Sequence, residues 1–157
     1  MGILSSCGRK HLDGHKDLTH HDSFIDLMSS VAKVYLPVLS PNGKDIEIVV
    51  KEGDEVKVGT RIGTRTDFYV PIYSPVSGVV KANELRFNAT VGRPVNHVVI
   101  ENDFKYAKLE NVLNKVTLDS TQEEIFAAIK EAGLVGLGGA GFPTYVKYNN
   151  PKNIHSL

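Results

Sequence analysis

The segment from Gly133 to Thr144 contains the residue types best suited to close contact with a ligand. Five of its first nine residues are glycine, and such a run forms no stable helix or central strand, because glycine loses the most backbone freedom on ordering. A loop of this kind lets a planar ring lie against the backbone, and its amide N–H groups can form an anion-binding concavity. Pro143 stiffens the end of the loop, and Lys147 follows within reach of a bound phosphate.

A group of histidines near the amino terminus is the second candidate for ligand chemistry. On a helix, His11 and His15 would share one face and could hold a divalent metal. Gly14 weakens a helix here, and no neighbouring residue is identified that would orient the ring nitrogens. We therefore predict a polar, partly ordered arm and no metal site. Metal binding stays the open alternative for the histidines of this arm: His11, His15, His20 and His21.

Composition excludes several classes of function. The 157 residues carry 18 acidic and 18 basic side chains, and a net charge of zero gives no electrostatic basis for binding nucleic acid or a membrane surface. The apolar runs are far shorter than the ~20 residues that span a bilayer, and the first residues do not resemble a secretion signal. Cys7 is the only cysteine, which excludes a cysteine-ligated cluster within one chain. These features predict a cytoplasmic protein without membrane insertion.

Residues 31–101 carry the signals of several short strands that would support the loop. Apolar, β-prone stretches are separated every eight to twelve residues by turn signals, among them Pro41-Asn42-Gly43 and Gly53-Asp54. This spacing predicts a small sandwich or barrel. The polar stretch Glu84–Arg93 is predicted to be a loop, and a short helical turn is considered at Leu109–Leu113.

Two stretches of this strand-rich region, Lys51–Gly63 and Ser74–Val80, resemble biotinyl and lipoyl carrier domains, which are two-sheet barrel-sandwich folds. In such carriers the modified lysine lies at a hairpin tip, five residues before the apolar residue that opens an Ile-x-Ser/Ala-Pro sequence. With Ile72 as that residue, the position is Asp67. Neither Asp67 nor its neighbours offers an amine to acylate, so we predict the carrier fold without the carrier function.

A helix is predicted directly before the glycine-rich loop. Two overlapping capping boxes, Ser120 with Glu123 and Thr121 with Glu124, mark its start. Apolar residues then recur at helical spacing for about twelve residues, and Gly133 stands where the C′ residue is expected. Such a helix is marginal alone in water and needs a surface to pack on.

The sequence Gly-Gly-Ala-Gly-Phe-Pro-Thr, with a lysine three residues on, resembles the flavin loop of the NADH-binding subunit of respiratory complex I. It resembles still more closely the RnfC subunit of the Rnf electron transport complex. The complex I loop carries two arginines within Gly-Leu-Arg-Gly-Arg-Gly-Gly, whereas Gly136–Gly139 here contains none, which favours the Rnf type.

This resemblance implies a mixed β and α/β architecture. It places a partly ordered arm at residues 1–30 and a small barrel-sandwich hybrid domain at 31–103. Residues 104–157 would supply a connector, a helix and the glycine-rich loop that opens an α/β domain for FMN and NADH. The resemblance covers about residues 31–157, the front part of a full-length family member. We therefore expect a truncated flavin domain, with the family's iron–sulfur cysteines outside this chain.

The resemblance also implies a site and a function. The chain would be the amino-terminal portion of an NADH-dependent flavin oxidoreductase, passing electrons from NADH through FMN to iron–sulfur centres outside this chain, and inactive alone. Its partners would be other subunits of an electron transport complex or a partner reductase, at the cytoplasmic side of the membrane. The alternative is a non-catalytic docking module with an empty loop. No catalytic residue or metal ligand is predicted, and the residues expected to bind the cofactor are Gly136, Gly138, Gly139, Ala140, Gly141, Phe142, Thr144 and Lys147.

Overall fold

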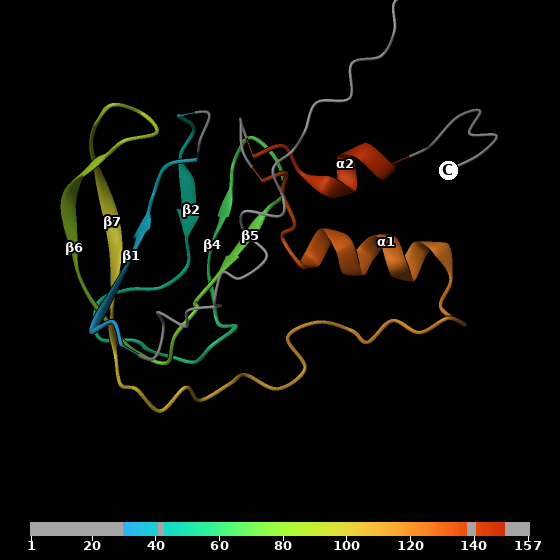
Figure 1. Cartoon of the computed structure of the whole chain (residues 1–157), viewed down its shortest axis with the longest axis horizontal. Helices are drawn as coiled ribbons and strands as arrows, with labels where there is room; N and C mark the ends of the chain where they lie inside the picture. Colours follow the sequence, from blue (N-terminus) through green and yellow to red (C-terminus); the bar gives the residue numbers. More distant parts are fainter. Residues whose placement is uncertain (1–29, 41–42, 138–140, 150–157) are drawn as a thin grey trace, which may run out of the picture.

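The structure, a computed structural model, describes residues 30–40, 43–137 and 141–149. Within these residues the strands form two antiparallel sheets, and two helices lie beside the second sheet (Figure 1). The four-stranded sheet has the order β1-β7-β6-β3, and the three-stranded sheet has the order β2-β4-β5. The strands are β1 (Lys33–Pro37), β2 (Ile46–Ile48), β3 (Glu55–Val56), β4 (Arg61–Arg65), β5 (Pro71–Tyr73), β6 (Gly78–Asn88) and β7 (Arg93–Asn102).

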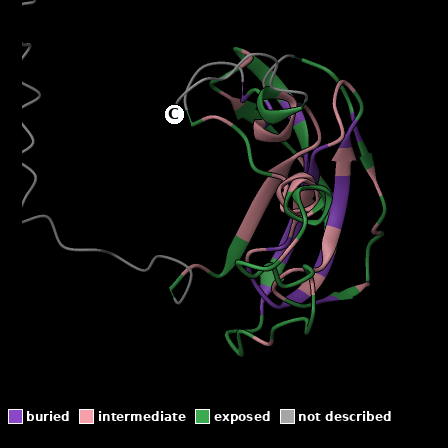
Figure 2. Cartoon of the chain, turned by 90° about the vertical axis from the view of Figure 1, so that its right-hand side faces the viewer, coloured by how far each residue is buried: buried purple, intermediate pink, exposed green. Residues whose placement is uncertain are grey.

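The hydrophobic core lies between the two sheets and is built almost entirely from valine and isoleucine. Ile62 of β4 meets Val98 and Ile100 of β7 there, and each of these side chains is at most 1% exposed. Buried positions run along the facing strands, whereas the outer surfaces are exposed or intermediate (Figure 2). β-branched side chains fill such a layer well because they pack tightly on a pleated surface. The predicted small sandwich is therefore present.

The long hairpin of β6 and β7 contradicts one prediction. The polar stretch Glu84–Arg93 is expected from the sequence to be a loop, but β6 continues to Asn88 and pairs with β7 as far as the Asn88–Arg93 pair. None of the residues from Glu84 to Asn88 is buried, and Leu85 and Phe87 are both mainly exposed. Leu85 and Phe87 alternate with polar residues here, a pattern typical of a strand that the prediction of a loop overlooked.

The connector between β7 and the first helix runs along one end of the sandwich in an irregular path (Figure 1). It is attached by a short parallel bridge, in which the Val58 N–H donates to the Ala107 carbonyl and the Leu109 N–H donates to the Val58 carbonyl, both at 2.9 Å. The helical turn considered at Leu109–Leu113 is replaced by a turn and a bend.

Helix α1 (Gln122–Glu131) begins and ends largely as the sequence predicts. The Thr121–Glu124 capping box is complete, with hydrogen bonds in both directions. The Ser120–Glu123 box is absent, because the Ser120 hydroxyl instead accepts a hydrogen bond from the Thr117 N–H at 2.9 Å. Gly133 follows the C-cap with φ of 64°, as expected of a C′ residue. The second helix, α2 (Thr144–Tyr148), is a single short turn packed against α1.

Polar contacts join the carboxyl end of α1 to the hairpin of β4 and β5. Arg61 and Tyr69 both donate hydrogen bonds to the Glu131 carboxylate, at 2.6 and 2.7 Å, and the Tyr73 hydroxyl donates to the Glu131 carbonyl at 2.7 Å. The hydrogen bond to Glu131 raises the pKa of Tyr69, since it favours the protonated hydroxyl. Gly133 then passes so close to Pro71 that a Cβ would lie 2.4 Å from the Pro71 carbonyl oxygen.

Gly133→Ala should therefore destabilise the protein more than Gly92→Ala. Both glycines have φ near 65°, at 64° and 67°, so both alanines meet the same backbone cost of about 1–2 kcal/mol. A Cβ at Gly92 meets nothing within 4 Å, whereas one at Gly133 meets backbone. We expect Gly133→Ala to cost at least about 1 kcal/mol more in the free energy of unfolding, measured in urea. Equal losses in the two variants would show that the Pro71 contact yields without cost.

Candidate functional site

The glycine-rich loop is closed at its base by a short antiparallel pairing. Val135 and Pro143 form an isolated bridge, the Gly136 N–H donates to the Phe142 carbonyl at 2.9 Å, and the Thr144 N–H donates to the Leu134 carbonyl at 2.9 Å. The Gly136 amide is therefore committed to closing the loop rather than left bare for an anion. The predicted cofactor residues Gly138, Gly139 and Ala140 lie outside the described residues.

Lys147 is brought to the base of this loop, as its predicted role requires. It lies one helical turn after Thr144 in α2, and its ammonium nitrogen is 3.7 Å from the position that a Cβ on Gly136 would occupy. Neither the Lys147 ammonium nor the Thr144 hydroxyl makes a hydrogen bond to another described residue. A cation and a hydroxyl thus lie beside the loop, and neither side-chain group is hydrogen-bonded to a described residue.

Phe142, one of the residues expected to bind the cofactor, packs against the sandwich with part of its ring. Its ring meets the ring of Phe68 edge-on, with centroids 5.4 Å apart and an interplanar angle of 69°. Such a contact anchors the loop to the hairpin of β4 and β5. Yet 41% of Phe142 stays exposed, which leaves part of the ring available to a ligand.

Arg65 is a component of the site that sequence reasoning missed. Arg65 is only 6% exposed, and its Nη1 donates to the Gly141 carbonyl at 2.7 Å. Its Nε and Nη2 donate to the two oxygens of Asp67, at 2.9 and 2.6 Å. The sequence offers one signal for this pair, the Arg-x-Asp spacing around the expected hairpin tip. From the sequence alone, however, Asp67 is considered only because it lacks an amine.

The Arg65–Asp67 pair is nearly removed from water. The two side chains are 4% and 12% exposed, so each charge relies on the other for compensation. A bidentate guanidinium–carboxylate pair is among the strongest hydrogen-bonded arrangements in proteins. Removing one partner of such a pair typically costs about 3–5 kcal/mol, because the other is left buried and unpaired.

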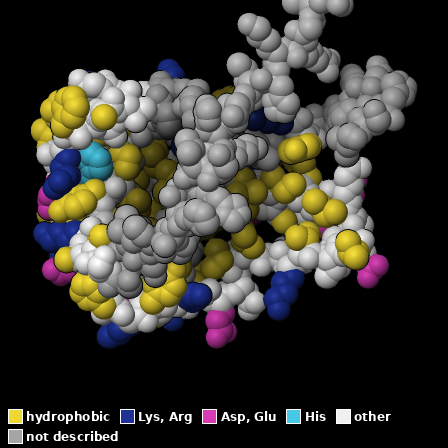
Figure 3. Space-filling view, viewed as in Figure 1, with side chains coloured by type: hydrophobic (Ala, Val, Ile, Leu, Met, Phe, Trp, Pro, Cys, Tyr) yellow, Lys and Arg dark blue, Asp and Glu magenta, His cyan; other side chains and the backbone are white. Residues whose placement is uncertain are grey.

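Apolar side chains surround the loop on the side formed by the helices (Figure 3). Neither α1 nor α2 has a buried residue, although α1 is amphipathic and its Phe126 meets Tyr145 of α2 edge-on. The exposed apolar residues of this region are Ile125, Leu134, Val135, Leu137, Phe142 and Tyr148. Four of these six residues belong to the loop itself, so the loop and the adjoining helices together expose apolar side chains, as a site for a largely apolar ring would require.

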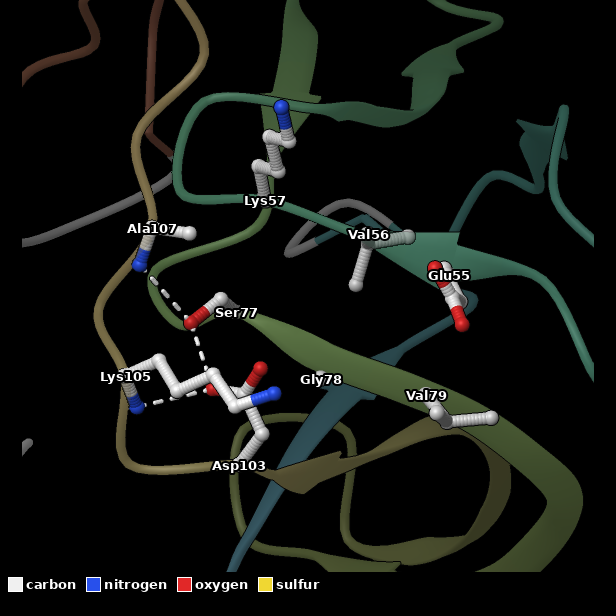
Figure 4. Close-up of a pocket in the computed structure, with 9 residues that line it drawn as sticks. All are labelled: Glu55, Val56, Lys57, Ser77, Gly78, Val79, Asp103, Lys105 and Ala107. Atoms are coloured by element: carbon white, nitrogen blue, oxygen red, sulfur yellow. Dashed lines mark hydrogen bonds between the residues drawn. The ribbon is translucent and has the colours of Figure 1, made fainter.

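A hollow of about 410 Å³ lies elsewhere, where β3, the start of β6 and the connector meet (Figure 4). Two of its polar side chains, Ser77 and Asp103, are hydrogen-bonded to one another. The Ser77 hydroxyl donates to Asp103 Oδ1 at 2.6 Å and accepts from the Ala107 N–H at 3.0 Å, and the Lys105 N–H donates to the same Asp103 oxygen at 2.9 Å. These hydrogen bonds lower the pKa of Asp103, and the hydrogen bond from Ser77 has the largest effect. The arrangement fastens the connector to the sandwich and contains no predicted site residue.

Membrane-spanning helices and clustered metal ligands are both absent from the part of the chain that the structure describes. No helix there is long and apolar enough to cross a membrane. No group of three or more histidine, cysteine, aspartate or glutamate side chains is placed there to hold a metal ion. The four histidines of the amino-terminal arm, His11, His15, His20 and His21, lie outside the described residues.

Two antiparallel sheets around one core define a barrel-sandwich hybrid, which is followed by a helix and a glycine-rich loop. Comparison with known families agrees. A family model described as "RnfC Barrel sandwich hybrid domain" matches residues 7–105. The chain belongs to this family.

Relatives of known name give the same result. The C subunit of a Na(+)-translocating ferredoxin:NAD(+) oxidoreductase complex from Acetobacterium woodii is 40% identical over 75% of this chain. The C subunit of a proton-translocating ferredoxin:NAD(+) oxidoreductase complex from Clostridium ljungdahlii is 33% identical over 95% of it. The corresponding subunit of an ion-translocating oxidoreductase complex from Vibrio cholerae is 34% identical over 73%. The matched regions are 27%, 33% and 15% of these relatives' own lengths.

Ser77→Ala should raise the pKa of Asp103 toward its usual range. The folded-state pKa lies below the unfolded one, so ionised Asp103 stabilises the fold above about pH 4, and this contribution is lost as pH falls through the folded pKa. The variant should consequently lose less stability on acidification than the original chain. Carboxyl titration by NMR measures the shift, with Glu101, whose pKa is lowered by Lys81, as an internal reference that should not move. An unchanged Asp103 titration would contradict the assignment.

Proposed function

We propose that this chain is the amino-terminal portion of an NADH-dependent flavin oxidoreductase of the RnfC type. Its glycine-rich loop would bind FMN, with Gly136, Gly138, Gly139, Ala140 and Gly141 allowing close approach of the backbone. The chemistry supplied there is hydride acceptance from NADH and one-electron delivery to iron–sulfur centres outside this chain, which FMN provides when bound. The names of the relatives, which specify ferredoxin:NAD(+) oxidoreductase complexes, support this direction.

The observation that carries the proposal is the position of Lys147 against Gly136. The ammonium lies next to the closed base of the loop, 3.7 Å from where a side chain on Gly136 would begin. A cation beside a glycine-rich backbone and an exposed apolar surface suits a ligand that has both a phosphate and a flat ring. The residues present therefore fit FMN.

Each described residue of the site has a distinct task in this proposal. Lys147 would pair with the phosphate or with a flavin oxygen, and the Thr144 hydroxyl would offer a hydrogen bond from the same helical turn. Phe142 would present its exposed edge to the ring system while its other edge rests on Phe68. Gly136 would keep the space above Lys147 open, since its own amide is used within the loop.

The proposal also includes further sequence and partner subunits that would surround this chain. We infer that α1, the loop and α2 open an α/β domain for FMN and NADH whose other wall is supplied by further sequence, because the apolar side of the two helices is exposed. The partners would be other subunits of an electron transport complex, as the relatives' names suggest, or a partner reductase. Attachment would be peripheral, at the cytoplasmic side of a membrane.

The direct test is cofactor content. The full natural polypeptide containing this sequence should be yellow, bind FMN stoichiometrically and oxidise NADH. The 157-residue chain should bind FMN weakly or not at all, because one wall of the pocket is missing. A colourless full polypeptide that cannot oxidise NADH would refute the proposal and favour the alternative, a non-catalytic docking module.

Lys147→Gln in the full polypeptide should raise the Kd for FMN by about tenfold or more, because a charge-assisted hydrogen bond contributes about 1.5–3 kcal/mol. Lys147→Arg should retain most of the affinity. Lys115→Gln removes the same charge from an exposed part of the connector and should leave the Kd unchanged. Quenching of flavin fluorescence on titration measures all three. Equal affinity in Lys147→Gln and Lys115→Gln would remove Lys147 from the site.

A further inference from the structure

We propose that Arg65 and Asp67 are positioning residues that fix the glycine-rich loop onto the tip of the β4–β5 hairpin. This tip, Thr66–Val70, is where carrier domains bear their modified lysine, and here it holds a neighbouring backbone instead. The contacts alone support the role of the pair in holding the loop. Its effect on the affinity for FMN rests on the function proposed above.

The geometry that carries this inference is a three-part chain of hydrogen bonds. Asp67 accepts from two nitrogens of Arg65, at 2.9 and 2.6 Å, and fixes the plane of the guanidinium. A third nitrogen, Nη1, then points to the Gly141 carbonyl and donates to it at 2.7 Å. The planar guanidinium presents its donors in a rigid fork, so the carboxylate on one edge determines where the other edge points.

Burial makes this arrangement specific. The Arg65 side chain is only 4% exposed, so water cannot replace the Gly141 carbonyl without opening the contact. A backbone carbonyl is a useful acceptor here because it fixes the main chain itself rather than a side chain that can rotate. The loop end from Gly141 to Pro143 therefore has a fixed position relative to the sandwich core.

A second contact also holds the loop against the hairpin. Phe68, next to Asp67, meets Phe142, next to Gly141, with ring centroids 5.4 Å apart. The Asp67 side chain also accepts from the Phe68 N–H at 3.0 Å, which ties the aromatic contact to the ion pair. Arg65, which Asp67 orients, and Phe68 of the tip thus hold two consecutive residues of the loop, Gly141 and Phe142.

These contacts differ in position from those that hold α1. Glu131, which precedes the loop, is bound by Arg61, Tyr69 and Tyr73. Arg65 instead holds Gly141, the residue at which the loop returns. Both arginines belong to β4, but they bind different segments. Arg65 can therefore be altered while the attachment of α1 is left in place.

The first arm of the test uses the 157-residue chain and needs no flavin. Arg65→Lys keeps the charge but loses the fork, and Asp67→Asn keeps the shape but loses the charge. Amide hydrogen exchange of Gly136 and Thr144, whose N–H groups close the loop, should become at least tenfold faster in both variants. Exchange at Val99 in the core should stay unchanged, which separates release of the loop from global unfolding.

Arg86→Gln is the matched control for this arm. Arg86 lies on the β6–β7 hairpin, where its guanidinium lies 4.0 Å above the Tyr35 ring, far in the sequence from the loop. It should leave exchange at Gly136 and Thr144 unchanged. Unchanged exchange at these two amides in both Arg65→Lys and Asp67→Asn would overturn the proposal, whatever the chain binds.

The second arm uses the full natural polypeptide and titrates it with FMN. Arg65→Lys and Asp67→Asn should each raise the Kd for FMN by about tenfold, although neither residue is proposed to touch the cofactor. Faster loop exchange with an unchanged Kd would overturn the link between the pair and the cofactor. If the unaltered polypeptide binds no FMN, the proposed function fails, and the exchange arm alone decides whether the pair positions the loop.

Discussion

The hydrogen bonds between the β4–β5 hairpin and the carboxyl-terminal segment are the interaction on which the candidate site depends. The hairpin contributes Ile62 to the core, and the same strand sends Arg61 to Glu131 and Arg65 to the Gly141 carbonyl. A strand alternates its side chains between two faces, so one short strand can belong to a core and still hold a second element. These contacts join the described ends of the glycine-rich loop to the sandwich.

The helices illustrate why polar contacts are needed at this boundary. Helix α1 has ten residues, no buried side chain and only one complete capping box, so it would be marginal in isolation. Its Phe126 meets Tyr145 of α2, and its apolar residues are at most half-buried. The contacts of Glu131 with Arg61, Tyr69 and Tyr73 are directional, and they hold the helix at a defined position without a shared hydrophobic core.

Family membership and the structure together explain what became of the carrier architecture. A carrier hairpin exposes a lysine so that its modified side chain can move between sites. Here the equivalent tip carries Asp67, whose oxygens bind Arg65, and Phe68, whose ring meets Phe142. The Phe68 ring faces a neighbouring segment of the same chain, and the Asp67 carboxylate holds Arg65, which donates to that segment. The tip has become a point of attachment, which is the opposite physical requirement from a mobile arm.

Several parts of the fold could be predicted from the sequence because their causes are local. The β-branched stretches and turn signals predicted the sandwich, and Thr121, Glu124 and Gly133 predicted the ends of α1, because caps act within a few residues. The outer end of β6 is predicted as a loop because most of its residues are polar, although Leu85 and Phe87 alternate with them, and its pairing with β7 shows that it is a strand. The irregular path of the connector similarly depends on its bridge to Val58.

The sequence by itself determined which residues are chemically suited to close contact with a ligand, because glycine, proline and lysine act through their own backbone and charge. Only the tertiary structure decided that Arg65 belongs with them. It lies 76 positions before Gly141, and no periodicity connects the two residues. Their contact exists because the core fixes β4 in one place and the contacts of Glu131 bring the end of α1, and with it the loop, beside the hairpin tip.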